Sequence, residues 1–302
     1  MQNVQYLTSK QQLESKLVAP HIDPRLHSFL LRVWENRAAI RTSGKRGLIY
    51  NMYLGTVDVR DDLGLDQLKE FLQGLHDKIG GLCDQIQSVD VEQDLAHVAS
   101  TYLDPERVAE EDFEDWVDTV DCLGKTFYHY NRTLGCIATQ RVYLNVKPDK
   151  AIEVMGWVVE DIVRKANFYP GVKKAKVAGP ANDRPDTIVI WIADEDAKGG
   201  VLDAINSYQS QAGYRDRFRM ETPAFAQNVG LASGSALRGV AVAMDPSDPT
   251  ISFGKSRTNV IFDAIDRAIQ AGNDRGKFIN DVLGDLRAAG IDVRNPHLHR
   301  RD

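Results

Sequence analysis

Positively charged side chains lie in the second half of the sequence at positions that suit an anion-binding site. Lys174 and Lys176 alternate within a segment that has the pattern of a β-strand, and Arg184 precedes an apolar strand expected at residues 186–192. Arg257 lies close to the start of an expected helix. Guanidinium groups engage two phosphate oxygens at once, and a helix N-terminus adds backbone donors. These residues predict a phosphate site.

Another expected strand, ending at residue 146, adds polar side chains to one surface of a sheet. Strand alternation assigns Val142, Leu144 and Val146 to the core and Arg141, Tyr143 and Asn145 to the opposite face. A phosphate binder needs no more than such a set. A catalyst also needs a base, and a lysine beside several arginines has its ammonium form disfavoured. Proton abstraction alpha to a carbonyl is therefore chemically feasible for this set.

Plainer structural interpretations exist for the same residues. The strand lysines could protect a sheet edge against aggregation. Arg141 and Arg257 could form ordinary ion pairs with the acidic first half of the chain. Tyr143 could be a half-buried sheet residue, and Ser252 could simply cap the helix that follows it. On residue types and spacing alone, these interpretations stay open beside the phosphate site.

Motifs of several common enzyme classes are absent from the sequence. There is no Walker sequence, no GxGxxG after a strand, no GxSxG, no HExxH and no kinase signature. ATP-driven, dinucleotide-dependent and familiar hydrolytic activities are thus disfavoured. No residues have metal-ligand spacing, so we expect neither a metal nor a cofactor. His97 and His129 have no partner at such a spacing and are interpreted as packed or surface residues.

Composition restricts the partners and the compartment. The 302 residues include 43 Asp and Glu against 37 Lys and Arg, a formal net charge of −6, so we expect no nucleic-acid or membrane partner. Three cysteines, Cys83, Cys122 and Cys136, lack CxxC spacing and are odd in number, which favours a reducing compartment. No signal peptide is evident, and no apolar run reaches the roughly 18–20 residues needed to span a bilayer. We expect a cytoplasmic protein.

Hydrophobic periodicity changes character near residue 127. Residues 1–126 are expected to form a mainly helical region, with amphipathic helices over 24–34 and 65–82 and a strongly acidic stretch at 92–121. Residues 127–302 alternate strands and helices. This order predicts an α+β fold in which the helical N-terminal part packs on a mixed β-sheet domain with flanking helices. Helices of that domain are expected from Pro148 and near residues 201–208, 260–269 and 277–289, and a further strand at 239–243.

An ordered set of short segments resembles a known family. The segments are Arg141-Val142-Tyr143-Leu144-Asn145-Val146, Lys176-Val177, Arg184-x-Asp186 leading into Ile188-Val189-Ile190-Trp191, Pro223 with Phe225, Gly239-Val240-Ala241-Val242 with Asp245-Pro246, and Ser252-Phe253-Gly254-x-x-Arg257. In this order they resemble the HopA-type family, which includes a type III secretion effector and lyases of class V lanthipeptide and thioamitide biosynthesis. Residues 48–53 resemble its N-terminal tyrosine motif.

The resemblance implies a phosphoserine or phosphothreonine lyase, distantly similar to the phosphothreonine lyases of other secreted effectors. Such an enzyme works with a partner kinase on a precursor peptide. It eliminates phosphate without a metal, leaving dehydroalanine or dehydrobutyrine in the biosynthesis of a ribosomally made peptide (RiPP). Carried over residue by residue, the implied site has Lys176 as the base, Tyr143 at the strand position of the acid, and Arg184, Arg257, Arg141 and Asn145 around the phosphate. The distant lyases have histidine where this chain has Tyr143, so the acid differs.

A non-catalytic function is the main alternative. The same basic face would serve a protein that binds phosphoproteins or a partner kinase, or a type III effector of that kind. Phosphopeptide binding without turnover would distinguish it from a lyase.

Overall fold

The computed structural model describes most of the second half of the chain and parts of the first. The described residues are 22–43, 46–54, 58–59, 65–79, 86–88, 124, 127–132, 138–165, 167–230, 236–246 and 251–299. The acidic stretch at 92–121, the three cysteines and His97 lie outside these residues.

Two compact units are formed by segments that alternate along the sequence. One, termed the helical unit, combines Met1–Gly55, Ala224–Gln227 and Ala243–Asp302; the other, termed the sheet unit, combines Thr56–Pro223 and Asn228–Val242. The predicted boundary after residue 126 therefore does not coincide with the division between these units. Periodicity reports local elements, whereas a compact unit depends on which elements pack together across long sequence separations.

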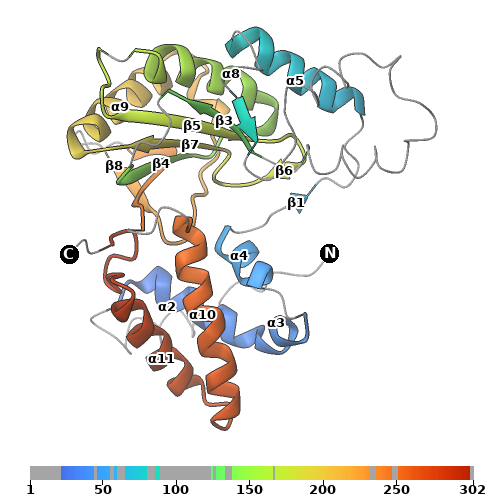
Figure 1. Ribbon diagram of the computed structural model, residues 1–302, viewed down its shortest axis with the longest axis vertical. Coiled ribbons are helices and arrows are strands. Elements are labelled where there is room, and N and C mark those ends of the chain that lie inside the picture. The colour runs from blue at the N-terminus through green and yellow to red at the C-terminus, as the bar shows by residue number, and fades with distance from the viewer. Residues whose placement is uncertain are drawn as a thin grey trace. The chain divides into compact units, whose positions relative to one another are not determined.

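A seven-stranded sheet forms in the described part of the chain, with the order β2-β3-β5-β7-β4-β9-β8 (Figure 1). The pairs β2–β3, β3–β5, β5–β7 and β7–β4 are antiparallel. The predicted α+β class is confirmed. The sequence analysis expected a mixed sheet, and these four strand pairs are all antiparallel. The strands are β2 (Ile86–Ser88), β3 (Phe127–Asn131), β4 (Gln140–Leu144), β5 (Val172–Ala178), β7 (Ile188–Ile192), β8 (Gln227–Gly230) and β9 (Ala236–Met244). A separate pair joins β1 (Asp58–Val59) to β6 (Asn182–Asp183).

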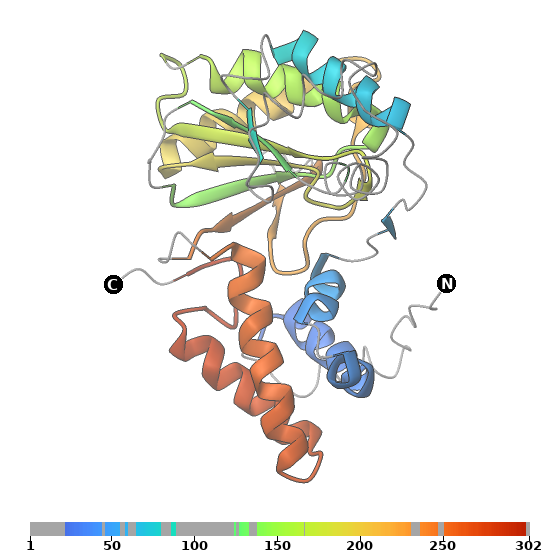
Figure 2. The ribbon, with the colours of Figure 1, turned by 45° about the vertical axis from the view of Figure 1, so that its right-hand side comes forward.

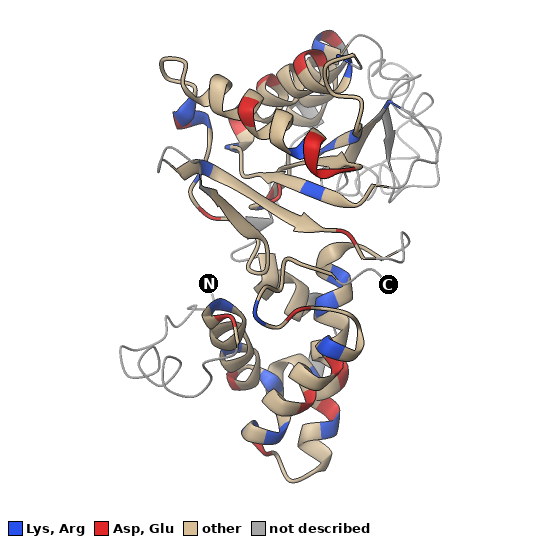
Figure 3. Ribbon diagram, turned by 90° about the vertical axis from the view of Figure 1, so that its left-hand side faces the viewer, with Lys and Arg blue, Asp and Glu red and all other residues tan. Residues whose placement is uncertain are grey.

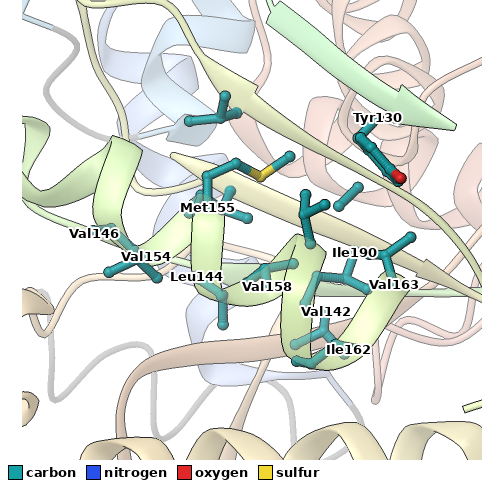
Figure 4. Packing of buried hydrophobic residues seen from close by; sticks show 14 of the residues in the cluster. Tyr130, Val142, Leu144, Val146, Val154, Met155, Val158, Ile162, Val163 and Ile190 are labelled. Carbon is teal, nitrogen blue, oxygen red and sulfur yellow. The ribbon is translucent and has the colours of Figure 1, made fainter. Parts of the chain in front are cut away.

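Helices cover one face of this sheet (Figures 1 and 2). They are α5 (Leu65–Ile79), α8 (Ala151–Trp157), which a π-helical turn extends over Val158–Val163, and α9 (Glu195–Gln209). The helix expected from Pro148 begins as a 3₁₀ turn, Pro148–Lys150. Its apolar stripe packs on the sheet: Figure 4 shows Val154, Met155, Val158, Ile162 and Val163 with the strand residues Val142, Leu144 and Ile190. The prediction that Val142, Leu144 and Val146 belong to the core is thus confirmed. The polar residues that alternate with them lie on the opposite face of the sheet.

The helical unit is built from helices at both ends of the sequence. They are α2 (Pro24–Glu35), α3 (Arg37–Ser43), α4 (Arg46–Leu54), α10 (Phe253–Gln270) and α11 (Arg275–Ala288). Ser252 caps α10 by accepting a hydrogen bond from the Lys255 N–H at 3.2 Å, as its type predicts. Trp34 of α2 stacks on Phe278 of α11 with ring centroids 5.1 Å apart. Aromatic packing therefore joins helices more than two hundred residues apart in sequence.

Two features are absent from the described residues: a membrane-spanning helix and a cluster of metal-ligating side chains. No helix there is long and apolar enough to cross a membrane. In the same part of the chain, no group of three or more His, Cys, Asp or Glu side chains is placed to hold a metal ion.

Candidate functional site

The strand of Lys174 and Lys176 lies inside the sheet, not at its edge. β5 pairs with β3 on one side and with β7 on the other. The alternative that these lysines protect a sheet edge is therefore wrong. Basic positions occur on the strands as well as on the helices (Figure 3).

Strand register places the predicted polar residues of β4 and β5 on one face. Trp191 of β7 is the register partner of both Lys174 and Arg141, which therefore form one row across three strands. Two pairs further along, Val189 is the partner of both Lys176 and Tyr143. Register partners project to the same side of a sheet. The two predicted strands are thus separated by β7 but turn their polar faces to the same side.

The Trp191 ring lies among three of these cations. Its centroid is 4.6 Å from Lys174 Nζ, 4.9 Å from Arg141 Cζ and 5.6 Å from Lys176 Nζ. These distances are within the roughly 6 Å range of cation–π attraction, which lets like charges gather on a half-buried surface. The indole is itself buried, with 6% of its surface exposed.

A second ring, Phe127 of β3, brings Lys176 and Arg184 together. Lys176 Nζ lies 3.4 Å and Arg184 Cζ 4.5 Å from the Phe127 centroid. Lys174, Lys176, Arg141 and Arg184, with the two rings, are termed the cationic face below. Four positive side chains from β4, β5 and the segment before β7 suit a multiply charged anion.

Arg184 is held in place by a carboxylate. Its Nε donates to Asp186 Oδ1 at 2.7 Å and its Nη2 donates to Asp186 Oδ2 at 3.0 Å. Asp186 is buried, with 6% exposed. Burial alone would raise the pKa of Asp186, but the Arg184 guanidinium and the Lys176 ammonium outweigh it and hold that pKa below its ordinary value. Asp186 is therefore ionised beside Lys176, and one edge of Arg184 is oriented by it.

His129 of β3 also belongs to this surface, which the sequence did not reveal. It is the register partner of Lys176, and its ring centroid lies 5.8 Å from that of Trp191. Burial, followed by the charges of Lys176, Lys174 and Arg141, lowers the pKa of His129 to about 2. Its neighbours are far away in sequence, so the ring looked isolated. The available signal was the alternation in residues 127–131, which puts Phe127 and His129 on one side of a strand.

Tyr143 and Asn145 differ in their surroundings. Tyr143 is buried in the row of Lys176, with 3% exposed. Asn145 lies just beyond β4, where its backbone N–H donates to the Gly239 carbonyl at 2.8 Å and its side-chain amide donates to the Glu221 carbonyl at 2.8 Å. A Cβ at Gly239, whose φ is 63°, would meet the Arg219 carbonyl oxygen at 2.2 Å, so this position requires glycine. The contacts described for Asn145 thus hold backbone segments together.

Arg257 lies in the helical unit, whereas the cationic face lies in the sheet unit. Only 1% of Arg257 is exposed. Its Nε donates to the Pro296 carbonyl at 2.9 Å, its Nη1 donates to Ser256 Oγ at 2.8 Å, and its Cζ lies 3.7 Å from the Phe253 ring centroid. These contacts tie the C-terminal segment to α10. Phosphate binding by Arg257 stays a prediction.

Residues of three family segments meet inside the helical unit. A Cβ at Gly254 would lie 2.6 Å from Tyr53 Cε1 and 2.7 Å from Tyr50 Cε2. The Tyr53 ring also packs 5.2 Å from Phe225 and 6.3 Å from Phe253, centroid to centroid. Glycine at 254 therefore allows the tyrosine segment to pack against the first turn of α10, which is a structural explanation for both segments.

The fold and the cationic face define an α+β protein in which four positive side chains gather around two rings on one face of the sheet. The chain belongs to the HopA1 effector protein family, whose model matches residues 123–298. The resemblance seen in the sequence is thereby confirmed.

Two solved effector proteins from Pseudomonas syringae share this fold. The protein from pv. tomato strain DC3000 is 22% identical with a TM-score of 0.57, over 85% of this chain and 91% of that one. The protein from pv. syringae strain 61 is 20% identical with a TM-score of 0.57, over 98% and 100%. The type III effector/phosphothreonine lyase OspF from Shigella flexneri matches at 11% identity and a TM-score of only 0.30, over 68% and 90%, which is too low to indicate a common fold. No curated protein matches the sequence.

Proposed function

We propose that the cationic face binds the phosphate of a phosphoserine or phosphothreonine in a peptide and that the protein is a lyase that eliminates it. The observation that supports this most directly is the convergence of Lys176 and Arg184 on the Phe127 ring, at 3.4 and 4.5 Å. An amine and a guanidinium thus both contact one ring, and the further cations Lys174 and Arg141 contact Trp191. In the proposal, the Lys176 amine is the base and the Arg184 guanidinium belongs to the groups that bind phosphate.

In the proposed reaction, neutral Lys176 Nζ takes the proton from Cα of the phosphorylated residue. The electron pair of that bond forms the Cα=Cβ double bond, and the Cβ–O bond breaks to release phosphate. Water is not consumed, and dehydroalanine or dehydrobutyrine remains. Arg184, Arg141 and Lys174 stabilise the charge that develops on the departing phosphate. Tyr143, in the row of Lys176, is the proposed hydroxyl donor to that phosphate.

Two predicted phosphate ligands have a weaker basis. Asn145 and Arg257 both use side-chain donors on backbone carbonyls, of Glu221 and Pro296 respectively. We keep them as proposed ligands, with roles subordinate to those of Arg184, Arg141 and the lysines.

We propose a biosynthetic setting for this activity from the sequence resemblance, whereas the matched family is named for effectors. The HopA-type resemblance includes lyases of lanthipeptide and thioamitide biosynthesis, so we propose that the substrate is a precursor peptide phosphorylated by a partner kinase. The kinase would supply the phosphate that this protein removes.

A second candidate function is phosphoprotein or kinase binding without chemistry, as in an effector. Asp186 favours it, because an ionised buried carboxylate beside Lys176 stabilises the ammonium form. A lysine held as an ammonium binds phosphate well and is a poor base.

Mass spectrometry of phosphoserine and phosphothreonine peptides incubated with the protein separates these functions. Loss of phosphoric acid is the expected result and identifies a lyase. Loss of phosphate with the hydroxyl restored would identify a phosphatase and contradict the proposal. An unchanged peptide that binds the protein would select the non-catalytic alternative.

A further inference from the structure

His129 is a titratable ring on the cationic face for which the proposed elimination has no role. It lies in β3, opposite Lys176 in the β3–β5 ladder, and 6% of it is exposed. Its ring is 5.8 Å from Trp191, the residue around which Lys174 and Arg141 also lie. The imidazole therefore sits among the cations that we propose bind phosphate.

Among the residues that the structure describes, the charges that act on His129 are positive. Lys176 and Lys174 act from β5 and Arg141 acts from β4; on its other side, β2 presents Gln87 as the register partner. With burial, these three charges lower the pKa of His129 to about 2. The ring is consequently neutral near neutral pH when the face holds no anion.

A dianion on this face changes the balance. It neutralises the same three cations and adds negative charge near the ring, and both effects favour the imidazolium form. The pKa of His129 must then be higher in the anion-bound protein than in the free protein. At any pH between the two values, binding is accompanied by uptake of a proton.

We infer that His129 accepts a proton when an anion binds the cationic face, so that phosphate binding and proton uptake are coupled at this site. The inference rests on the phosphate site of the proposed function and adds a group that sets its pH dependence. Anion binding should tighten as the pH is lowered from the pKa of His129 in the complex to the pKa of His129 in the free protein. Over this range, each unit of pH decrease tightens binding by up to about tenfold.

Sulfate is the probe for this coupling, because it stays a dianion over the whole range and takes up no proton itself. Isothermal titration calorimetry at about pH 5, where a histidine of ordinary pKa would already be protonated, is run in two buffers that differ in ionisation enthalpy. The expected result is an uptake of up to one proton per sulfate, increasing as the pH is lowered from neutrality. His129→Asn is expected to bind sulfate with no proton uptake and a flatter pH dependence.

His27→Asn is the matched control. His27 is also buried, with 5% exposed, and its pKa is lowered by burial and by Arg275, but it lies in the helical unit. This variant is expected to keep the proton uptake of the parent protein. Uptake that disappears in His27→Asn, or that persists in His129→Asn, overturns the inference.

The unsubstituted protein gives an independent test if a variant fails to fold. In NMR spectra, the His129 ring resonances are expected to shift to imidazolium values when sulfate is added. Sulfate that does not bind, or that binds with these resonances unchanged, overturns the inference. Proton uptake without peptide elimination would support the coupling at His129 and contradict the lyase activity. Elimination without proton uptake would support the lyase activity and contradict the coupling.

Discussion

Arg184 and Asp186 form a two-point ion pair next to Lys176, with donor–acceptor distances of 2.7 and 3.0 Å. Both side chains are largely buried, at 12% and 8% exposure. The pair orients the guanidinium over Phe127, 4.5 Å from the ring centroid. It also places a negative charge beside the proposed base.

Replacing Asp186 by Asn should destabilise the protein by about 3–5 kcal/mol, because Arg184 is left as a buried charge without its carboxylate. Urea unfolding measures this change. Asp216→Asn is the matched control, since it breaks the Arg238–Asp216 pair, in which the carboxylate is 78% exposed. Exposed pairs contribute about 0–1 kcal/mol. Equal losses in the two variants would contradict the importance of the buried pair.

The same pair predicts a pH dependence of stability. The pKa of Asp186 is lower in the folded protein than its ordinary value of 3.8. Its stabilising contribution is therefore fully present above that value and is lost as the pH falls through the lower folded value. Unfolding measured from neutral to strongly acidic pH should show less acid-induced loss in Asp186→Asn than in the parent. An identical pH profile in both would argue against the assigned shift.

Lys176→Ala should reduce elimination from a phosphopeptide by at least about a hundredfold, the usual contribution of a general base. Lys173→Ala provides the control. Lys173 lies on the same strand at an irregular position of the β5–β7 register, and its carbonyl accepts a hydrogen bond from Arg132 N–H that alanine preserves. Time courses by mass spectrometry should show activity in Lys173→Ala only. Full activity in Lys176→Ala would show that another group is the base.

Gly254→Ala should cost about 1–3 kcal/mol, the usual penalty for overpacking. The added methyl group would meet Tyr53 and Tyr50 at 2.6 and 2.7 Å, and ring atoms cannot yield without moving the helix that bears them. Gly284→Ala has no atom within 4 Å of the new methyl group and should stabilise α11 by up to about 1 kcal/mol. Thermal unfolding of both variants tests the contrast. Equal midpoints would mean that the tyrosine contact does not constrain position 254.

Arg257→Ala should lower the free energy of unfolding by about 1.5–3 kcal/mol, the usual value for hydrogen bonds to charged groups. The Pro296 carbonyl loses its donor at 2.9 Å, so the C-terminal segment should also become more sensitive to proteases. Arg287→Ala, at an exposed position of α11, should change neither property. Unchanged stability in Arg257→Ala together with lost phosphopeptide binding would instead support the predicted phosphate contact.

Local patterns in the sequence were sufficient for several of the elements and for part of the site. Period-3.6 stripes located α2, α5 and α10, and strand alternation separated the buried Val142 and Leu144 from Arg141 and Tyr143. The same alternation put Lys174 and Lys176 on one face of β5. These predictions succeeded because each depends on a few neighbouring residues, whose positions the strand or helix period fixes.

Relationships between distant segments were decided by the tertiary structure alone. Whether the lysine strand lay at an edge depended on β3 and β7 pairing with it, and His129 gained its charged neighbours only through that pairing. Arg257 looked equivalent to Arg184 in sequence, yet one is bound by backbone carbonyls of the C-terminal segment and the other by Asp186. Such differences depend on which strands pair and which chain segments meet, and they arise from packing over long sequence separations that no local period records.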